Sequence, residues 1–149
     1  MTAFASRAPF AAAYPSSLAV YCSDGRFTEA VEDLLKHLGH ARLDTLTIPG
    51  GAGLLELTSA SASAAETVRQ SVGFLITAHH IDTVVLVAHA GCGYYKNRLP
   101  YDSPASLERR QLSDLRTAAK WLVGEHPKLR VHRYFARPSD GHVAFEPVE

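Results

Sequence analysis

Three side chains that could hold a metal ion stand where two apolar runs of the sequence end. Residues 18–21 are followed by Cys22, and residues 85–88 are followed by His89 and, three positions later, by Cys92. Short apolar runs that stop abruptly are typical of buried strands, so we expect two strands to deliver these side chains. Two thiolates and one imidazole suit zinc and leave its fourth tetrahedral position open, which is the pattern of catalytic rather than structural zinc sites.

Two charged residues follow the first of these cysteines. Zinc lowers the pKa of a bound water to near neutrality, and a nearby carboxylate, here Asp24, can orient that water or accept its proton. Arg26 can form a bidentate pair of hydrogen bonds with the Asp24 carboxylate and hold it ionised. The alternative is that Asp24 only caps the following turn and that Arg26 is its surface partner, and the sequence leaves this open.

The composition is that of an ordinary globular protein. A chain of 149 residues is long enough for one domain with one core. Lys and Arg number 15, as do Asp and Glu, so no basic excess is present to bind nucleic acid. No apolar run approaches the roughly 20 residues of a membrane span, so we expect no membrane partner. We expect residues 1–16 to be a flexible arm, residues 17–149 to be a single zinc-binding domain, and the protein to be cytoplasmic with reduced thiols.

Hydrophobic spacing marks the elements that must position the candidate site. Thr28 can cap a helix that ends at Gly39 and whose buried face is formed by Val31, Leu34, Leu35 and Leu38. Residues 43–48 have the length and apolar character of a strand. Pro-Gly-Gly-Ala-Gly at residues 49–53 can continue neither regular structure and predicts a loop with exposed backbone. Because no Gly-Lys-Ser or Gly-x-Gly-x-x-Gly pattern follows, we interpret it as a tight connection rather than a phosphate-binding loop.

The second half of the chain continues the alternation of strands and helices. A Ser/Ala tract at residues 59–65 leads into a helix with one face formed by Val68, Val72, Leu75, Ile76 and His79. A polar loop leads through Pro104 into another helix, which stops at Gly124 and Pro127 and whose apolar side is formed by Leu112, Leu115, Ala119 and Leu122. Residues 129–135 predict a strand. The turn signal Pro-Ser-Asp-Gly at residues 138–141 predicts a hairpin that returns as a strand over residues 142–148.

This order of elements predicts an α/β fold. We expect a mostly parallel central sheet with helices on both faces and an antiparallel C-terminal edge strand. In such sheets ligands gather beyond the carboxyl ends of strands, where the connections diverge to opposite faces. The strands that end at Cys22 and His89 are therefore expected to be neighbours.

The two motifs together resemble the β-class carbonic anhydrases. The resemblance rests on Cys22-x-Asp24-x-Arg26 and His89-x-x-Cys92-Gly93, and it runs from about residue 17 to residue 93. It implies a β-carbonic-anhydrase-like fold, with one Zn²⁺ per chain held by Cys22, His89 and Cys92 and an Asp24–Arg26 dyad beside it. The implied activity is that of a lyase, the reversible hydration of carbon dioxide to bicarbonate by a zinc-bound hydroxide. The implied assembly is a homodimer or higher even oligomer with sites near the subunit interface.

Two other functions would use the same residues. A zinc hydrolase of carbonyl sulfide or carbon disulfide would share every motif and differ in access to the pocket. A non-catalytic, zinc-binding dimeric protein would use the metal only to stabilise its fold. A redox dithiol enzyme is disfavoured because the chain has no Cys-x-x-Cys motif.

Overall fold

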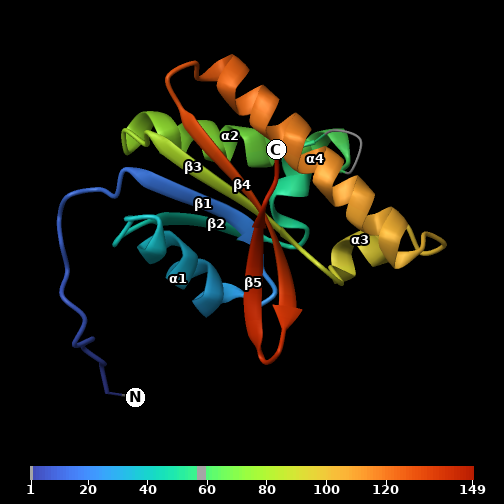
Figure 1. Cartoon of the computed structure of the whole chain (residues 1–149). Coiled ribbons are helices and arrows are strands. Elements are labelled where there is room, and N and C mark those ends of the chain that lie inside the picture. The colour runs from blue at the N-terminus through green and yellow to red at the C-terminus, as the bar shows by residue number, and fades with distance from the viewer. Residues whose placement is uncertain (1, 57–59) are drawn as a thin grey trace.

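A five-stranded sheet with helices on both faces forms the body of the protein (Figure 1). The computed structural model describes residues 2–56 and 60–149. The strand order is β2-β1-β3-β4-β5, in which β5 alone is antiparallel to its neighbour. This confirms the predicted fold class. The strands are β1 (Ser17–Cys22), β2 (Asp44–Ile48), β3 (Thr83–His89), β4 (Arg130–Ser139) and β5 (His142–Pro147).

The helices are distributed unequally between the two faces of the sheet. Figure 1 shows α1 alone on one face, and α2 and α4 on the other. The α-helices are α1 (Thr28–His37), α2 (Ala62–Ala78), α3 (Gly93–Arg98) and α4 (Pro104–Glu125), and η1 (Gly51–Leu55) is a 3₁₀ helix. None of the helices in residues 2–56 and 60–149 is long and apolar enough to cross a membrane.

Strands β1 and β3 are buried along their whole length because each has a strand on both sides and helices above and below. Alternate side chains of each strand enter different cores, as the pleat requires. Leu18 and Leu86 pack with α2 and α4, whereas Ala19 and Val85 pack with α1. Full burial of side chains such as these two leucines contributes about 1.5–3 kcal/mol each to folding. The two central strands therefore form a rigid base for the residues at their ends.

The beginning of α1 differs from the sequence prediction. Thr28 is the first residue of the helix rather than its cap; Phe27 occupies the cap position, and no side chain accepts a capping hydrogen bond there. Phe27 is buried in the core on the α1 face, so packing compensates for the missing cap. The predicted end is confirmed, because Gly39 follows the helix with φ +90°, a conformation that glycine adopts without strain.

The predicted exposed loop at residues 49–53 is wrong. Residues 51–55 form η1, and all five are buried. Gly50 (φ +85°) and Gly51 (φ +52°) turn the chain inward, and a side chain at Gly51 would collide with the backbone of Cys22. The glycines therefore allow close packing against the end of β1 instead of exposing the backbone to solvent.

In the second half of the chain the structure differs from the sequence prediction in three further places. The predicted polar loop contains α3, and α4 passes through Gly124 to end at Glu125. Strand β4 extends to Ser139, because the reversal is a two-residue turn at Asp140 (φ +48°) and Gly141 (φ +79°), the geometry favoured in hairpins. The Ser/Ala tract contributes the first residues of α2, although Ser59 lies outside the described residues.

The chain before β1 has no helix or strand over residues 2–16. The last residues of this segment contact the folded domain: Arg42 donates hydrogen bonds to the carbonyls of Ala11 and Ala13. Tyr14 stacks on His79 with ring centroids 4.0 Å apart. His79, expected on the apolar face of α2, instead follows the helix and pairs with Asp44 at 2.6 Å. The flexibility of this arm stays a prediction.

Candidate metal centre

The sheet topology brings the two ends of the candidate site together. Strands β1 and β3 are adjacent and parallel, with Val20 opposite Leu86, so both carboxyl ends lie at the same edge of the sheet. The prediction that these two strands are neighbours is confirmed. Cys22, His89 and Cys92 are all buried, and one potential ligand atom from each lies within 4.8 Å of the others.

The spacing of the two sulfurs suits a tetrahedral zinc ion. The Sγ atoms of Cys22 and Cys92 are 4.0 Å apart. Two sulfurs at the usual zinc–sulfur distance and the tetrahedral angle would be about 3.8 Å apart. The cysteines therefore need almost no movement to share a metal.

The His89 ring is oriented to offer a lone pair to a cation. Its Nδ1 donates a hydrogen bond to the Ala90 carbonyl at 3.0 Å, which leaves Nε2 as the acceptor nitrogen. Nε2 is buried and makes no hydrogen bond within the residues that the structure describes. Phe27 packs against the ring with centroids 4.3 Å apart. A buried imidazole nitrogen with no partner costs free energy, and a metal ion would satisfy it.

Charge within the cluster favours one thiolate. The Cys92 thiol donates a hydrogen bond to Cys22 and lowers the pKa of the Cys22 thiol to about 4, although burial alone would raise it. The same hydrogen bond and burial both raise the pKa of Cys92. Burial alone would lower the pKa of His89, but the Cys22 thiolate and the Ala90 carbonyl outweigh it, so that pKa is raised. A cation between the sulfurs would take the place of their shared proton.

Asp24 and Arg26 form the predicted pair beside this cluster. Arg26 Nε lies 2.9 Å from Asp24 Oδ1, and Arg26 Nη2 lies 2.6 Å from Oδ2. The hydrogen bond from the Arg26 side chain lowers the pKa of Asp24 to about 2. The Asp24 carboxylate also accepts the backbone N–H of Arg26 at 3.2 Å, so it stabilises the local turn as well. Asp24 therefore both stabilises the turn that follows it and is kept ionised by Arg26, so the structure contains both of the interactions that the sequence left open. A catalytic role for the pair stays a prediction.

The sequence prediction missed the packing between the glycine turn and α3. Tyr95 is buried with Cys22 and Cys92, and Tyr94 packs against them half-buried. A Cβ at Gly50 would lie 2.5 Å from the Tyr94 ring, and one at Gly53 would lie 2.0 Å from the Tyr95 hydroxyl. The glycine spacing in the sequence indicates a turn, but it does not reveal which side chains fill the space.

We expect Gly53→Ala to lower the free energy of unfolding by about 1–3 kcal/mol, because the added methyl must displace the buried Tyr95. Urea denaturation would measure the change. Gly73→Ala is the matched control: nothing lies within 4 Å of its Cβ position inside α2, and the substitution should stabilise the protein slightly. Equal stabilities of Gly53→Ala and wild type would contradict the packing described here.

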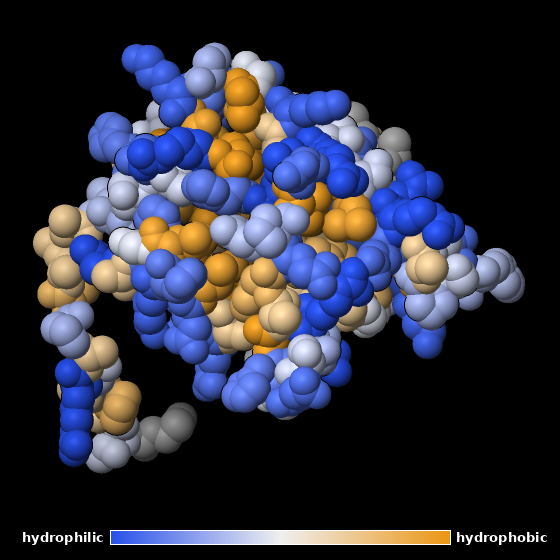
Figure 2. All heavy atoms as spheres, viewed as in Figure 1, coloured by the Kyte–Doolittle hydropathy of each residue, from blue (hydrophilic) through white to orange (hydrophobic). Residues whose placement is uncertain are grey.

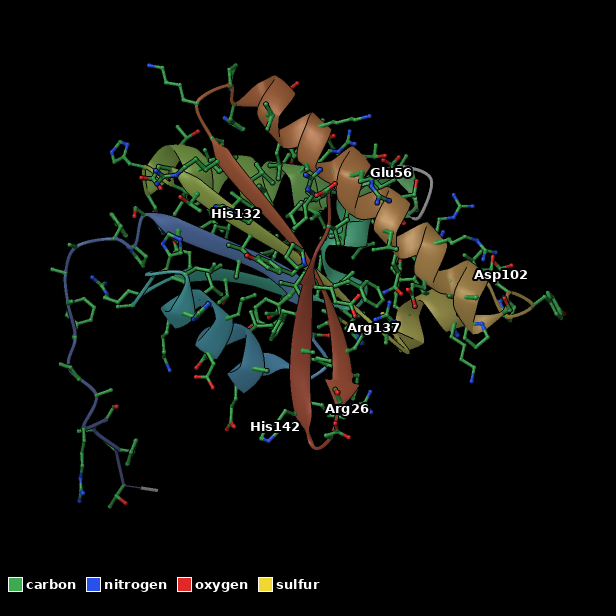
Figure 3. The ribbon with its side chains drawn as sticks, viewed as in Figure 1. Arg26, Glu56, Asp102, His132, Arg137 and His142 are labelled. Atoms are coloured by element: carbon green, nitrogen blue, oxygen red, sulfur yellow. The ribbon has the colours of Figure 1, made fainter. Side chains whose placement is uncertain are left out.

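A hollow opens next to Arg26, between α1 and the β4–β5 hairpin. Its volume is about 870 Å³, and its apolar lining includes Phe27, Val143 and Phe145. Figure 2 shows hydrophobic side chains between α1 and β5 on this face. Figure 3 places Arg26 beside the hairpin tip that carries His142. Arg26 of the Asp24–Arg26 pair therefore lines a hollow that is partly apolar and partly charged.

The comparison with protein families agrees with this geometry. The profile of the family described as "Putative carbonic anhydrase" matches residues 15–146. An uncharacterized protein from Rickettsia bellii is 24% identical over 80% of this chain and 74% of its own length. A second, from Rickettsia conorii, is 24% identical over 80% of this chain and 66% of its own length.

Solved structures of β-carbonic anhydrases share the fold. One of two tetrameric enzymes from Sordaria macrospora superposes with a TM-score of 0.59 at 14% identity, covering 89% of this chain and 81% of its own. Isoform I from Trichomonas vaginalis gives 0.58 at 13% identity, covering 94% and 87%. CafA of Aspergillus fumigatus gives 0.57 at 15% identity, covering 90% and 76%. At these identities the likeness establishes the fold.

Proposed function

The chain belongs to the family described as "Putative carbonic anhydrase", and we propose that it catalyses the zinc-dependent, reversible hydration of carbon dioxide to bicarbonate. The observation that carries this proposal is the convergence of Cys22, His89 and Cys92, with the Nε2 of His89 buried and without a hydrogen bond among the described residues. Two sulfurs and one nitrogen are the ligands that zinc prefers, and they leave one position for water.

Zinc held by these three residues would supply Lewis acidity, which lowers the pKa of a water molecule in the fourth position. Asp24 follows Cys22 by two residues and is 20% exposed, so its carboxylate is available at the edge of the site. Ionised, it can accept a hydrogen bond from the attacking water and orient it. Phe27 and the other buried side chains around His89 exclude bulk solvent from the inner side of the site.

Arg26 would keep Asp24 in this role. Its guanidinium engages both carboxylate oxygens, so the acid group is turned toward Arg26 and stays ionised. A carboxylate without this partner would be free to turn toward the metal and compete with water. The pair would therefore hold the fourth position open.

Stopped-flow measurement of carbon dioxide hydration, with zinc content determined on the same sample, tests the proposal. We expect activity that rises from mildly acidic to alkaline pH. Carbonyl sulfide and carbon disulfide should be assayed in parallel, because a hydrolase of these compounds would use the same residues. Zinc-loaded protein that hydrates no carbon dioxide at any pH would overturn the proposal.

We also infer that the protein forms a homodimer through the α1 face of the sheet. Within the described residues this face is covered by α1 alone, and Val143, Phe145 and Tyr134 remain partly exposed on it. Sheets with parallel strands normally have cover on both faces, and two-fold dimers are the commonest oligomers.

Light scattering should give about twice the chain mass of 16.2 kDa at micromolar concentration. Val143→Glu, which places a charge in the hollow, should shift the protein toward monomer. Val123→Glu is the control, because Val123 is an exposed apolar residue on α4. A wild-type monomer would contradict this assembly, as would two variants with the same mass.

A further inference from the structure

Helix α4 buries two polar side chains against the segment that carries two of the candidate ligands. Gln111 is 3% exposed and Asp114 is 2% exposed. They lie three residues apart and so share one face of the helix. Their neighbours on α4 that pack into the core are apolar, namely Leu115, Ala118, Ala119 and Leu122. Burying an amide and a carboxyl in such surroundings is costly unless specific partners satisfy them.

Gln111 holds the His89 end of the segment. Its Nε2 donates a hydrogen bond to the main-chain carbonyl of His89 at 3.0 Å. The ring Nδ1 of His89 donates a second hydrogen bond, to the Ala90 carbonyl. The backbone and the ring of His89 are thus fixed by separate hydrogen bonds, which leaves Nε2 with a defined direction.

Asp114 holds the Cys92 end through Tyr95. The Tyr95 hydroxyl donates to Asp114 Oδ2 at 2.5 Å, and both residues are buried. Cys92 is the cap residue of α3, and Tyr95 lies in the first turn of that helix. The backbone N–H of Lys96 donates to the Cys92 carbonyl at 3.1 Å, so Cys92 is part of the same first turn. Fixing Tyr95 therefore fixes the turn that orients the sulfur.

Gly53 completes this arrangement from the opposite side. Its missing side chain leaves room for the Tyr95 hydroxyl, so the tyrosine is held between η1 and α4. The segment from His89 to Tyr95 bends at Gly91, where φ is +69°. A segment with such a bend needs support at both ends to keep two ligands in register, and α4 provides one hydrogen bond at each end.

We propose that Gln111, and Asp114 acting through Tyr95, are positioning residues that preorganise His89 and Cys92 for the metal. This inference rests on the proposed metal centre but concerns residues outside the two motifs. Supporting hydrogen bonds of this kind commonly change metal affinity by about 10-fold to 100-fold. Both hydrogen bonds come from one rigid helix, so α4 sets the distance between the two ligands.

Cobalt(II) binding to the metal-free full chain tests the proposal, because cobalt reports ligand geometry through its visible absorption bands. We expect Tyr95→Phe and Gln111→Leu to bind cobalt about 10-fold or more weakly than wild type, with shifted bands. Asp114→Leu should also weaken cobalt binding and shift the bands. The loss in the double variant should be smaller than the sum of the two single losses, because both changes break the same hydrogen bond.

Leu122→Ala is the matched control. Leu122 is fully buried on the same helix, so its truncation lowers stability without touching the ligand segment. It should bind cobalt like wild type and with the same bands. Tyr95→Phe removes a single oxygen atom and carries the test even where Asp114→Leu does not fold.

Wild-type affinity and bands in both Tyr95→Phe and Gln111→Leu would overturn the positioning role. An equal loss of affinity in Leu122→Ala would also overturn it, because the effect would then be one of general stability. A wild-type protein that binds no cobalt or zinc would instead refute the metal centre itself, so the two failures are distinguishable.

Discussion

Replacing Cys92 with serine should leave the protein with almost no bound zinc, whereas the wild type should carry about one zinc ion per chain. The serine hydroxyl stays protonated at neutral pH and is a poor zinc ligand, so the site would lose one of its three protein ligands. The remaining pair, Cys22 and His89, would hold a metal far more weakly. Cys22→Ser and His89→Ala should have the same effect because each removes one corner of the same site.

Elemental analysis of proteins purified in parallel and dialysed against the same zinc-buffered solution would measure this effect. Arg26→Ala serves as a control, since Arg26 lies beside the cluster without belonging to it and should retain zinc. Circular dichroism would check that the variants remain folded. Stoichiometric zinc in all three ligand variants would refute the assignment of the site.

Arg26→Ala and Asp24→Asn should both keep zinc and lose carbon dioxide hydration by about 100-fold or more, the usual range for removal of a positioned acid–base group. The two substitutions would act by different routes. Without Arg26, the Asp24 carboxylate loses the side-chain hydrogen bonds that hold both of its oxygens. With asparagine, the negative charge that orients the attacking water and pairs with Arg26 is lost.

The pH dependence follows from the depressed pKa of Asp24. Its pKa is about 2 in the folded protein, against an ordinary value near 3.8, because the Arg26 side chain stabilises the carboxylate. The ionised pair is therefore fully formed above about pH 4 and is lost only as the pH falls through about 2. Between about pH 6 and pH 9 the pair does not titrate, so a rise in wild-type rate over this range reports deprotonation of the attacking water.

Stopped-flow rates for wild type, Arg26→Ala and Asp24→Asn across this pH range would decide the point, with zinc content measured for each. Lys36→Ala is a suitable control, since it removes an exposed basic residue that pairs only loosely with Asp33, at 3.6 Å. Equal rates in wild type and Arg26→Ala would remove the pair from the mechanism. A rate change without loss of zinc would separate this role from metal binding.

The sequence alone was enough to predict the fold class and the residues that converge at the sheet edge. Apolar runs such as residues 85–88 identify buried strands, because a strand with neighbours on both sides and helices on both faces must be apolar throughout. The rule that ligands gather at the carboxyl ends of parallel strands then places Cys22 beside His89. Helix α1 was visible for the same reason, since Val31, Leu34 and Leu35 repeat with the helical period.

Local signals were less informative where packing overrides them. Thr28 has the chemistry of a cap, but the burial of Phe27 decides where α1 begins. The glycines of residues 49–53 indicate a turn, yet the turn is buried, because it packs against Cys22 and the two tyrosines of α3.

The packing that supports the candidate metal centre was decided only by the tertiary structure. Gly53, Tyr95 and Asp114 are far apart in the chain, and no periodic pattern links them. A glutamine or aspartate on a helix is usually exposed, so the sequence gives no reason to place Gln111 and Asp114 inside. Residue types and their spacing along the chain determine which atoms can bind a metal, whereas the packing of α4 against the end of β3 determines how firmly those atoms are held.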